Sequence, residues 1–186
     1  MINKLSKKIT YAICTQEYNT LDMARIQYAL NILLCEGFKL VALFMVFSLI
    51  GRLDYFTLSL IILISIRSFA GGVHVKGNVH CLFLSTLLFI CTCVIAPILK
   101  SIGIVHYASA AILSIIPLAL NAPVSSVTRP IRSGKKRLYF KIAAISFSVL
   151  WAVVLFAFFS DTYSKCGFMT IILQNIQLIF VKEDLK

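Results

Sequence analysis

The chain has 186 residues, of which 60% are hydrophobic and only 13% are charged. Soluble domains carry about 25% charged residues, so a soluble globule of this size is excluded, and the mean hydropathy of +0.93 predicts an integral membrane protein. The 18 Lys and Arg residues outnumber the 7 Asp and Glu residues and give a net charge of +11. In a membrane protein such an excess indicates topology and contact with anionic lipids rather than with nucleic acid.

Two polar helices are predicted before the first membrane span. Residues 1–14 repeat Ile and Leu at three- and four-residue spacing with lysines between them, which is typical of a helix lying flat in the headgroup region. A second helix starts near Thr20 and is too polar to span, because it contains Asp22 and Glu36. Residues 1–35 are therefore expected at the cytoplasmic membrane surface.

The rest of the chain consists of apolar runs with short links. It predicts an all-α polytopic membrane protein with about six transmembrane helices in a single membrane domain, residues 1–186, whose spans fall within 37–181. The predicted spans are 37–51, 54–69, 81–99, 103–120, 138–159 and 167–181.

Charge predicts the orientation of these spans. All the Lys and Arg residues except Arg52, Lys100 and Lys165 fall on the side that carries both termini. Positive residues favour the cytoplasmic side. Both termini, the 67–80 segment and the 121–137 loop are therefore expected to face the cytoplasm of a multi-pass protein in the cell membrane.

Reactive side chains concentrate between Arg67 and Cys81, which includes His74 and His80. A cysteine is a nucleophile as its thiolate, and a nearby imidazole can take its proton. In one continuous helix His74 and Cys81 would lie about 10 Å apart along the axis, so the segment must fold back. Glycines 71, 72 and 77 permit such a turn.

Other interpretations of this segment stay open. His80 is a competing base, although as the neighbour of Cys81 it projects in another direction from a helix. A metal site made of His74, His80 and Cys81 lacks a fourth ligand, so neither a metal nor a cofactor is expected. Cys81 and Arg67 can also be purely structural, with Arg67 extending to the headgroups and the glycines forming a simple loop.

The segment resembles the accessory gene regulator protein B (AgrB) family of membrane cysteine endopeptidases in Gram-positive quorum sensing. The pattern Arg-x4-Gly-x-His-x6-Cys-x3-Ser is present as Arg67, Gly72, His74, Cys81 and Ser85. The element from Asn121 to Val124 and the basic cluster after it are similar to a cytoplasmic loop of the family. The resemblance covers nearly the whole chain.

The resemblance implies that Cys81 is the nucleophile and His74 its base, acting on an AgrD-type precursor peptide without a cofactor. Such enzymes remove the C-terminal tail of the precursor and hold the remainder as an acyl-enzyme thioester. A cysteine or serine within the peptide then closes a thiolactone or lactone ring, which gives the autoinducing peptide. The resemblance leaves room for a homodimer.

Supporting residues have two interpretations each. Ser85 lies one helical turn beyond Cys81 and can orient the substrate or bond to its own helix. Lys135, Lys136 and Arg137 can act only as a topology signal or can attract the acidic tail of the precursor. Arg67 and Gly72 are expected to support the site.

A function from another class is a membrane peptide exporter or transporter without proteolytic activity. In that case Arg67, Lys76 and the glycines would line a pathway. The two halves of the chain lack the matched, Gly- and Pro-interrupted segments of inverted-repeat transporters, which favours the protease.

Overall fold

The computed structural model describes residues 2–13, 20–72, 78–99, 102–124 and 133–180. It divides the chain into two compact units, Met1–Gly51 and Arg52–Lys186, and each is considered by itself. The described residues form helices of several kinds and contain no strand.

The first unit consists of two helices, α1 (Ile2–Ile13) and α2 (Thr20–Leu49), which pack against each other. The sequence predicted a polar helix from Thr20 and a separate span over 37–51, but α2 is one continuous helix of 30 residues. Gly37 is the only glycine in α2, which contains no proline, and an ion pair joins Glu36 to Lys39 across that position at 2.5 Å. The helix therefore continues without a break from its polar part into its apolar part.

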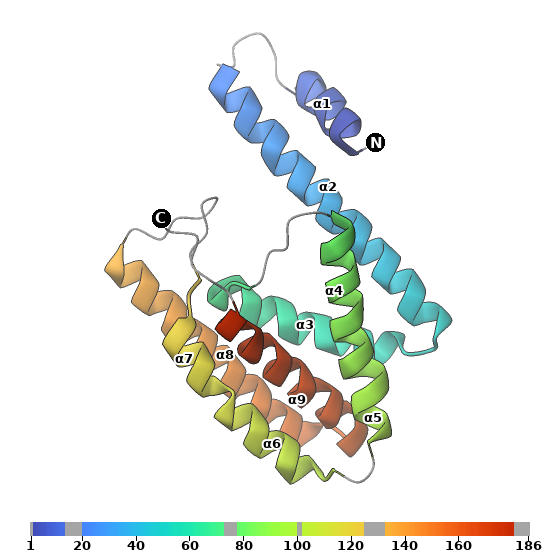
Figure 1. Cartoon of the computed structure of the whole chain (residues 1–186), viewed down its shortest axis with the longest axis vertical. Coiled ribbons are helices and arrows are strands. Elements are labelled where there is room, and N and C mark those ends of the chain that lie inside the picture. The colour runs from blue at the N-terminus through green and yellow to red at the C-terminus, as the bar shows by residue number, and fades with distance from the viewer. Residues whose placement is uncertain (1, 14–19, 73–77, 100–101, 125–132, 181–186) are drawn as a thin grey trace. The chain divides into compact units, whose positions relative to one another are not determined.

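The second unit is a bundle around one central helix, α9 (Figure 1). Besides α9, its elements are α3 (Leu53–Ala70), α4 (Asn78–Ile90), the π-helix η1 (Cys91–Ile95), α5 (Ala96–Ile98), α6 (Ile104–Leu113), α7 (Ile115–Asn121), α8 (Gly134–Phe158) and the 3-10 helix η2 (Gln177–Phe180). Helix α9 (Asp161–Ile176) packs against α3, α5, α6, α7, α8, η1 and η2.

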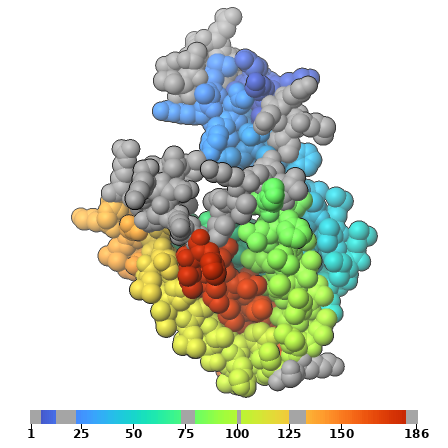
Figure 2. All heavy atoms as spheres, viewed as in Figure 1, coloured from blue at the N-terminus to red at the C-terminus, as the bar shows by residue number. Residues whose placement is uncertain are grey.

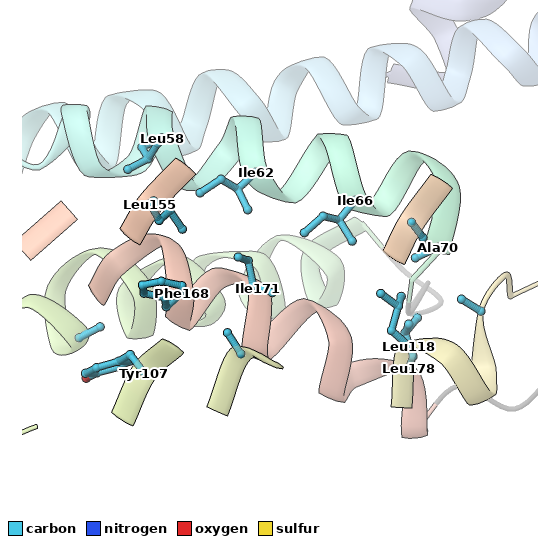
Figure 3. Close-up of a cluster of buried hydrophobic side chains, with 14 residues drawn as sticks. Leu58, Ile62, Ile66, Ala70, Tyr107, Leu118, Leu155, Phe168, Ile171 and Leu178 are labelled. Atoms are coloured by element: carbon cyan, nitrogen blue, oxygen red, sulfur yellow. The ribbon is translucent and has the colours of Figure 1, made fainter. Parts of the chain in front are cut away.

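The apolar core of this unit lies where α3, α8 and α9 meet. Side chains of α3 such as Ile62 and Ile66 face Leu155 of α8 and Phe168 and Ile171 of α9 (Figure 3). These helices approach closely, because a Cβ at Gly167 of α9 would lie 2.5 Å from Leu155 Cδ2. Small residues permit such contacts between helices in membranes.

Helix α9 accompanies α3 along its whole length. At one end the hydroxyl of Tyr163 donates to the Asp54 carboxylate, and at the other the side-chain amide of Gln174 donates to the Gly71 carbonyl at 3.0 Å. With η2 it corresponds to the predicted sixth span, 167–181, but it begins earlier, at Asp161. Helix α9 follows closely after α8, which ends at Phe158, and the chain reverses its direction between them.

Five helices of the described residues are long and apolar enough to cross a membrane: Met23–Leu49, Leu53–Ala70, His80–Ile98, Ile104–Asn121 and Gly134–Phe158. The last four coincide with the second to fifth predicted spans, whereas the first extends well before the predicted span 37–51, and together they confirm an all-α polytopic membrane protein. Helix α9 is not among them, because it has only 16 residues and many buried polar side chains. Its last turn and η2 reach the surface between α7 and α4 (Figure 2), where Ile179 and Phe180 are exposed.

Overpacking at Gly167 is expected to loosen this bundle. A Gly167→Val substitution must displace the fully buried Leu155 side chain, and such strain costs about 1–3 kcal/mol. We expect a lower melting temperature in detergent, measured by size-exclusion chromatography after heating. Gly37→Val in α2 is the control, because nothing lies within 4 Å of its added Cβ. Equal melting temperatures for the two variants would contradict the close contact.

Candidate functional site

The end of α3 is built around two glycines. The Gly71 N–H donates to the Arg67 carbonyl at 2.9 Å, and Gly71 has φ 79°, in the left-handed region that glycine favours. A Cβ at Gly72 would lie 2.7 Å from Nε and 2.9 Å from Cζ of Arg67. The guanidinium therefore lies directly against the Gly72 backbone. Arg67 and Gly72, both members of the sequence motif, form one local unit, the Arg67–Gly72 turn.

Two distant segments hold this turn. The Val124 N–H donates to the Ala70 carbonyl at 3.0 Å, and a Cβ at Gly71 would lie 3.2 Å from the Val124 carbonyl oxygen. From α9, the fully buried Gln174 donates to the Gly71 carbonyl, and Gln177 in turn donates to Gln174 Oε1. The turn is thus fixed by α3, by the segment after α7 and by α9.

The segment after α7 is the element that the sequence linked to the family loop. The Asn121 side chain donates to the Pro117 carbonyl at 3.0 Å, and the Ala122–Pro123 peptide bond is cis. The structure therefore brings the Asn121–Val124 element against the Arg67–Gly72 turn, although more than 45 residues separate them in the sequence.

Gln174 did not stand out in the sequence analysis. Its signal was available, because Gln174 and Asn175 interrupt the apolar run predicted as the sixth span. Polar residues within a span usually have a partner inside the protein. Which backbone group Gln174 binds depends on the tertiary contact between α9 and α3.

Cys81 is the fourth residue of α4 and lies in its first turn, as expected. It is half-buried and not part of a disulfide, whereas the neighbouring His80 is exposed. Ser85 is half-buried one turn further along the same face. The first turn of a helix presents backbone N–H groups and the positive end of the helix dipole, which favour a thiolate.

The Arg67–Gly72 turn, the Asn121–Val124 element and the first turn of α4 lie toward one end of the bundle, which we name the motif end. Phe89, in the last turn of α4, packs against Phe56, in the first turn of α3, with ring centroids 4.7 Å apart. Helix α4 therefore ends beside the start of α3, which it crosses at a steep angle, and its own start lies toward the motif end (Figure 1). Helix α8 passes the end of α3, because Phe69 in the last turn of α3 lies 6.2 Å from Phe140 and 5.3 Å from Phe147 between ring centroids, and the first turn of α8 extends beyond this end of α3.

The first turn of α8 is strongly basic. Lys135, Lys136 and Arg137 follow Gly134, the first residue of α8, and all three residues are exposed. Cations in the first turn oppose the helix dipole and weaken the helix. Their position is therefore not explained by helix stability and indicates a role in topology or ligand binding.

The opposite end of the bundle, which we name the Asp54 end, carries the described carboxylates. Asp54 accepts the Tyr163 hydroxyl, and Asp161 pairs with the buried Lys165 at 2.6 Å. Arg52 lies 5.2 Å from the centroid of the Tyr55 ring. Among the described residues of this unit, the motif end is therefore basic, and each described carboxylate at the Asp54 end has a partner.

Some predicted site residues lie outside the described residues. His74, Lys76 and Gly77 fall in the segment 73–77, so the predicted pairing of His74 with Cys81 stays a prediction, as does the alternative metal site of His74, His80 and Cys81. Arg129 and Arg132 fall in 125–132. Among the described residues, no group of three His, Cys, Asp or Glu side chains is arranged to hold a metal ion.

Known proteins resemble the chain over nearly its whole length. The family model of accessory gene regulator B, AgrB, matches residues 1–178. A putative AgrB-like protein of Clostridium beijerinckii is 30% identical over 185 residues, which covers 97% of this chain and 90% of the relative. No solved structure matches the chain. The chain therefore belongs to the AgrB family, which links it to accessory gene regulator quorum sensing.

Proposed function

We propose that this AgrB-family protein is a membrane cysteine endopeptidase that cleaves an AgrD-type precursor peptide, with Cys81 as nucleophile and His74 as general base. One observation carries the proposal. The hydrogen-bonded Arg67–Gly72 turn directly precedes the segment that contains His74, and the next described helix has Cys81 in its first turn. A fixed turn and a helix N-terminus are the two supports that a base and a thiolate need.

The reaction begins when the His74 imidazole takes the Cys81 proton and the thiolate attacks the scissile carbonyl. Backbone N–H groups in the first turn of α4 would stabilise the oxyanion. The peptide C–N bond then breaks, His74 returns the proton to the leaving amine, and the N-terminal part of the precursor remains as a thioester on Cys81.

Ring closure follows by acyl transfer within the bound peptide. A thiol or hydroxyl of the peptide gives up its proton to His74 and attacks the thioester, which releases Cys81 as the thiolate and forms a thiolactone or lactone. Transfer between two thiols is nearly isoenergetic, whereas water would hydrolyse the thioester irreversibly. The site must therefore hold the internal nucleophile close and exclude water.

The motif end is proposed to face the cytoplasm. Its described charges are all cationic, whereas at the Asp54 end the cations Arg52 and Lys165 lie near the carboxylates of Asp54 and Asp161. This distribution follows the positive-inside rule. The exposed first turn of α8 then lies where it can attract anionic lipid headgroups and the acidic tail of a precursor.

Substitution of Cys81 tests the proposal directly. We expect Cys81→Ala and His74→Ala to reduce precursor cleavage by about 10²-fold or more, because each removes a group that moves a proton or forms the covalent bond. Cleavage is measured on membranes that contain the full chain and a tagged precursor. Cys91→Ala, a half-buried cysteine of the same span, should cleave at the wild-type rate. Full cleavage by Cys81→Ala would exclude the protease, and retained peptide flux without cleavage would favour a transporter.

Gln174 is proposed as a positioning residue that acts through the Gly71 carbonyl. Gln174→Leu leaves that carbonyl without this donor inside the bundle, a loss of about 1–3 kcal/mol. We expect kcat for cleavage to fall about tenfold while KM changes little, since the precursor does not touch this side chain. Gln177→Leu is the matched control, because Gln177 donates to Gln174 and not to the turn. An equal fall in kcat for both variants would contradict a specific role of the Gly71 contact.

The basic turn of α8 is tested by its salt dependence. Replacing Lys135, Lys136 and Arg137 together by glutamine should weaken precursor binding several-fold at low ionic strength and much less near 1 M salt, where the Debye length is about 3 Å. Binding is measured by fluorescence anisotropy of a labelled precursor on proteoliposomes. Arg52→Gln, at the Asp54 end, should leave the salt dependence unchanged. An unchanged dependence in the triple variant would reduce these residues to a topology signal.

A further inference from the structure

Two cysteines of different helices meet inside the second unit. Cys93 of η1 and Cys166 of α9 are fully buried free thiols, and their sulfur atoms lie 4.0 Å apart. Neither belongs to the sequence motif, and because 73 residues separate them in the chain, the sequence does not predict that they lie together. The packing of η1 against α9 brings the two cysteines together.

Hydroxyl groups surround the two sulfurs. Ser59 Oγ lies 3.0 Å from Cys166 Sγ and 3.6 Å from Cys93 Sγ, and Thr170 donates to the same Ser59 oxygen at 3.0 Å. Thr92 Oγ1 lies 3.4 Å from Cys93 Sγ. The cluster thus joins α3, η1 and α9 through polar groups whose hydrogen bonds lie within the protein.

The backbone around Cys93 is unusual. Residues Cys91–Ile95 form a π-helix between α4 and α5, and such single wide turns occur frequently at functional sites. A wide turn shifts the side chains after it relative to a continuous α-helix. Here it places Thr92 and Cys93 in the buried cluster while Cys91 stays half-buried elsewhere.

We propose that Cys93 and Cys166 form a redox-active dithiol that a small uncharged peroxide closes into a disulfide. The two sulfurs need to approach by about 2 Å to reach the S–S bond length of about 2.05 Å. Rotation of one cysteine side chain about χ1 moves its sulfur atom by a distance of that order. No chain segment has to cross another. A small uncharged oxidant is required because both thiols lie within the membrane bundle.

The step balances with hydrogen peroxide as the oxidant. One thiol reacts with H2O2, the O–O bond breaks, and a sulfenic acid and one water form. The other thiol then attacks the sulfenic sulfur, which forms the S–S bond and releases the second water. Two electrons pass from the thiols to the peroxide, and a dithiol reductant reverses the change by exchange.

The dithiol lies away from the proposed catalytic site. Cys166 Sγ also lies 3.6 Å from the carbonyl of Tyr55, in the first turn of α3 at the Asp54 end. The disulfide would therefore link the far end of the Cys81-bearing span to α9 and leave the Arg67–Gly72 turn free of new bonds. Its formation does not depend on Cys81 being a nucleophile.

A variant that keeps only these two cysteines tests the proposal. Cys14, Cys35, Cys81 and Cys91 are replaced by serine in the full chain, and membranes are treated with hydrogen peroxide, denatured in detergent and labelled with polyethylene glycol maleimide. We expect two adducts before oxidation, none after it, and two again after dithiothreitol. The loss should occur within the monomer band on a nonreducing gel.

The matched control exchanges Cys93 for its neighbour on the same span. A variant that keeps Cys91 and Cys166, with Cys93 replaced by serine, should retain both adducts after the same treatment. Peptide mapping of the peroxide-treated wild-type chain by mass spectrometry supplies a readout that needs no substitution, and the Cys93–Cys166 linkage is expected there. Absence of that linkage, or equal loss of adducts from the control variant, would overturn the proposal.

Discussion

The arrangement of the second unit depends on one constraint, which is that polar groups inside a membrane protein must find their partners within the protein. Helix α9 carries Thr170, Gln174 and Asn175 as buried side chains. Thr170 bonds to α3, Gln174 bonds to the turn after α3, and Asn175 donates to Ser114 between α6 and α7 at 3.1 Å. A helix of this composition is stable in lipid only at the centre of the bundle, and the other helices are arranged around it.

The geometry of the candidate site depends on contacts with this central helix. The Arg67–Gly72 turn belongs to α3, but its position is fixed by Gln174 of α9 and by Val124 after α7. Arg67 and Gly72, which lie close together in the sequence motif, are thus held in place by segments far away in the chain. The proposed chemistry at Cys81 depends on this support, because proton transfer requires heavy atoms within about 3 Å of each other.

Much of the architecture could be predicted from the sequence, because hydrophobic length and charge are local properties. The spans near 54–69 and 81–99 coincide with candidate membrane helices, and Cys81 lies at the start of its helix as expected. The break predicted before residue 37 is absent, since a single glycine does not end a helix with good helix formers on both sides. The contacts of Gln174 and the meeting of Cys93 with Cys166 are long-range, and no spacing in the sequence encodes them.

The short link between α8 and α9 has a consequence for how the protein is made. Only Phe159 and Ser160 separate the two helices, and Ser164 bonds back to the carbonyl of Leu155 at 2.7 Å. A segment as polar as α9 has little tendency to leave the translocon for lipid by itself. It is synthesised after α3 to α8, so its partners are already in the bilayer when it emerges. Helix α9 can therefore dock as the second arm of a hairpin once α3 to α8 are in place, and the Arg67–Gly72 turn gains its contact with Gln174 only at that step.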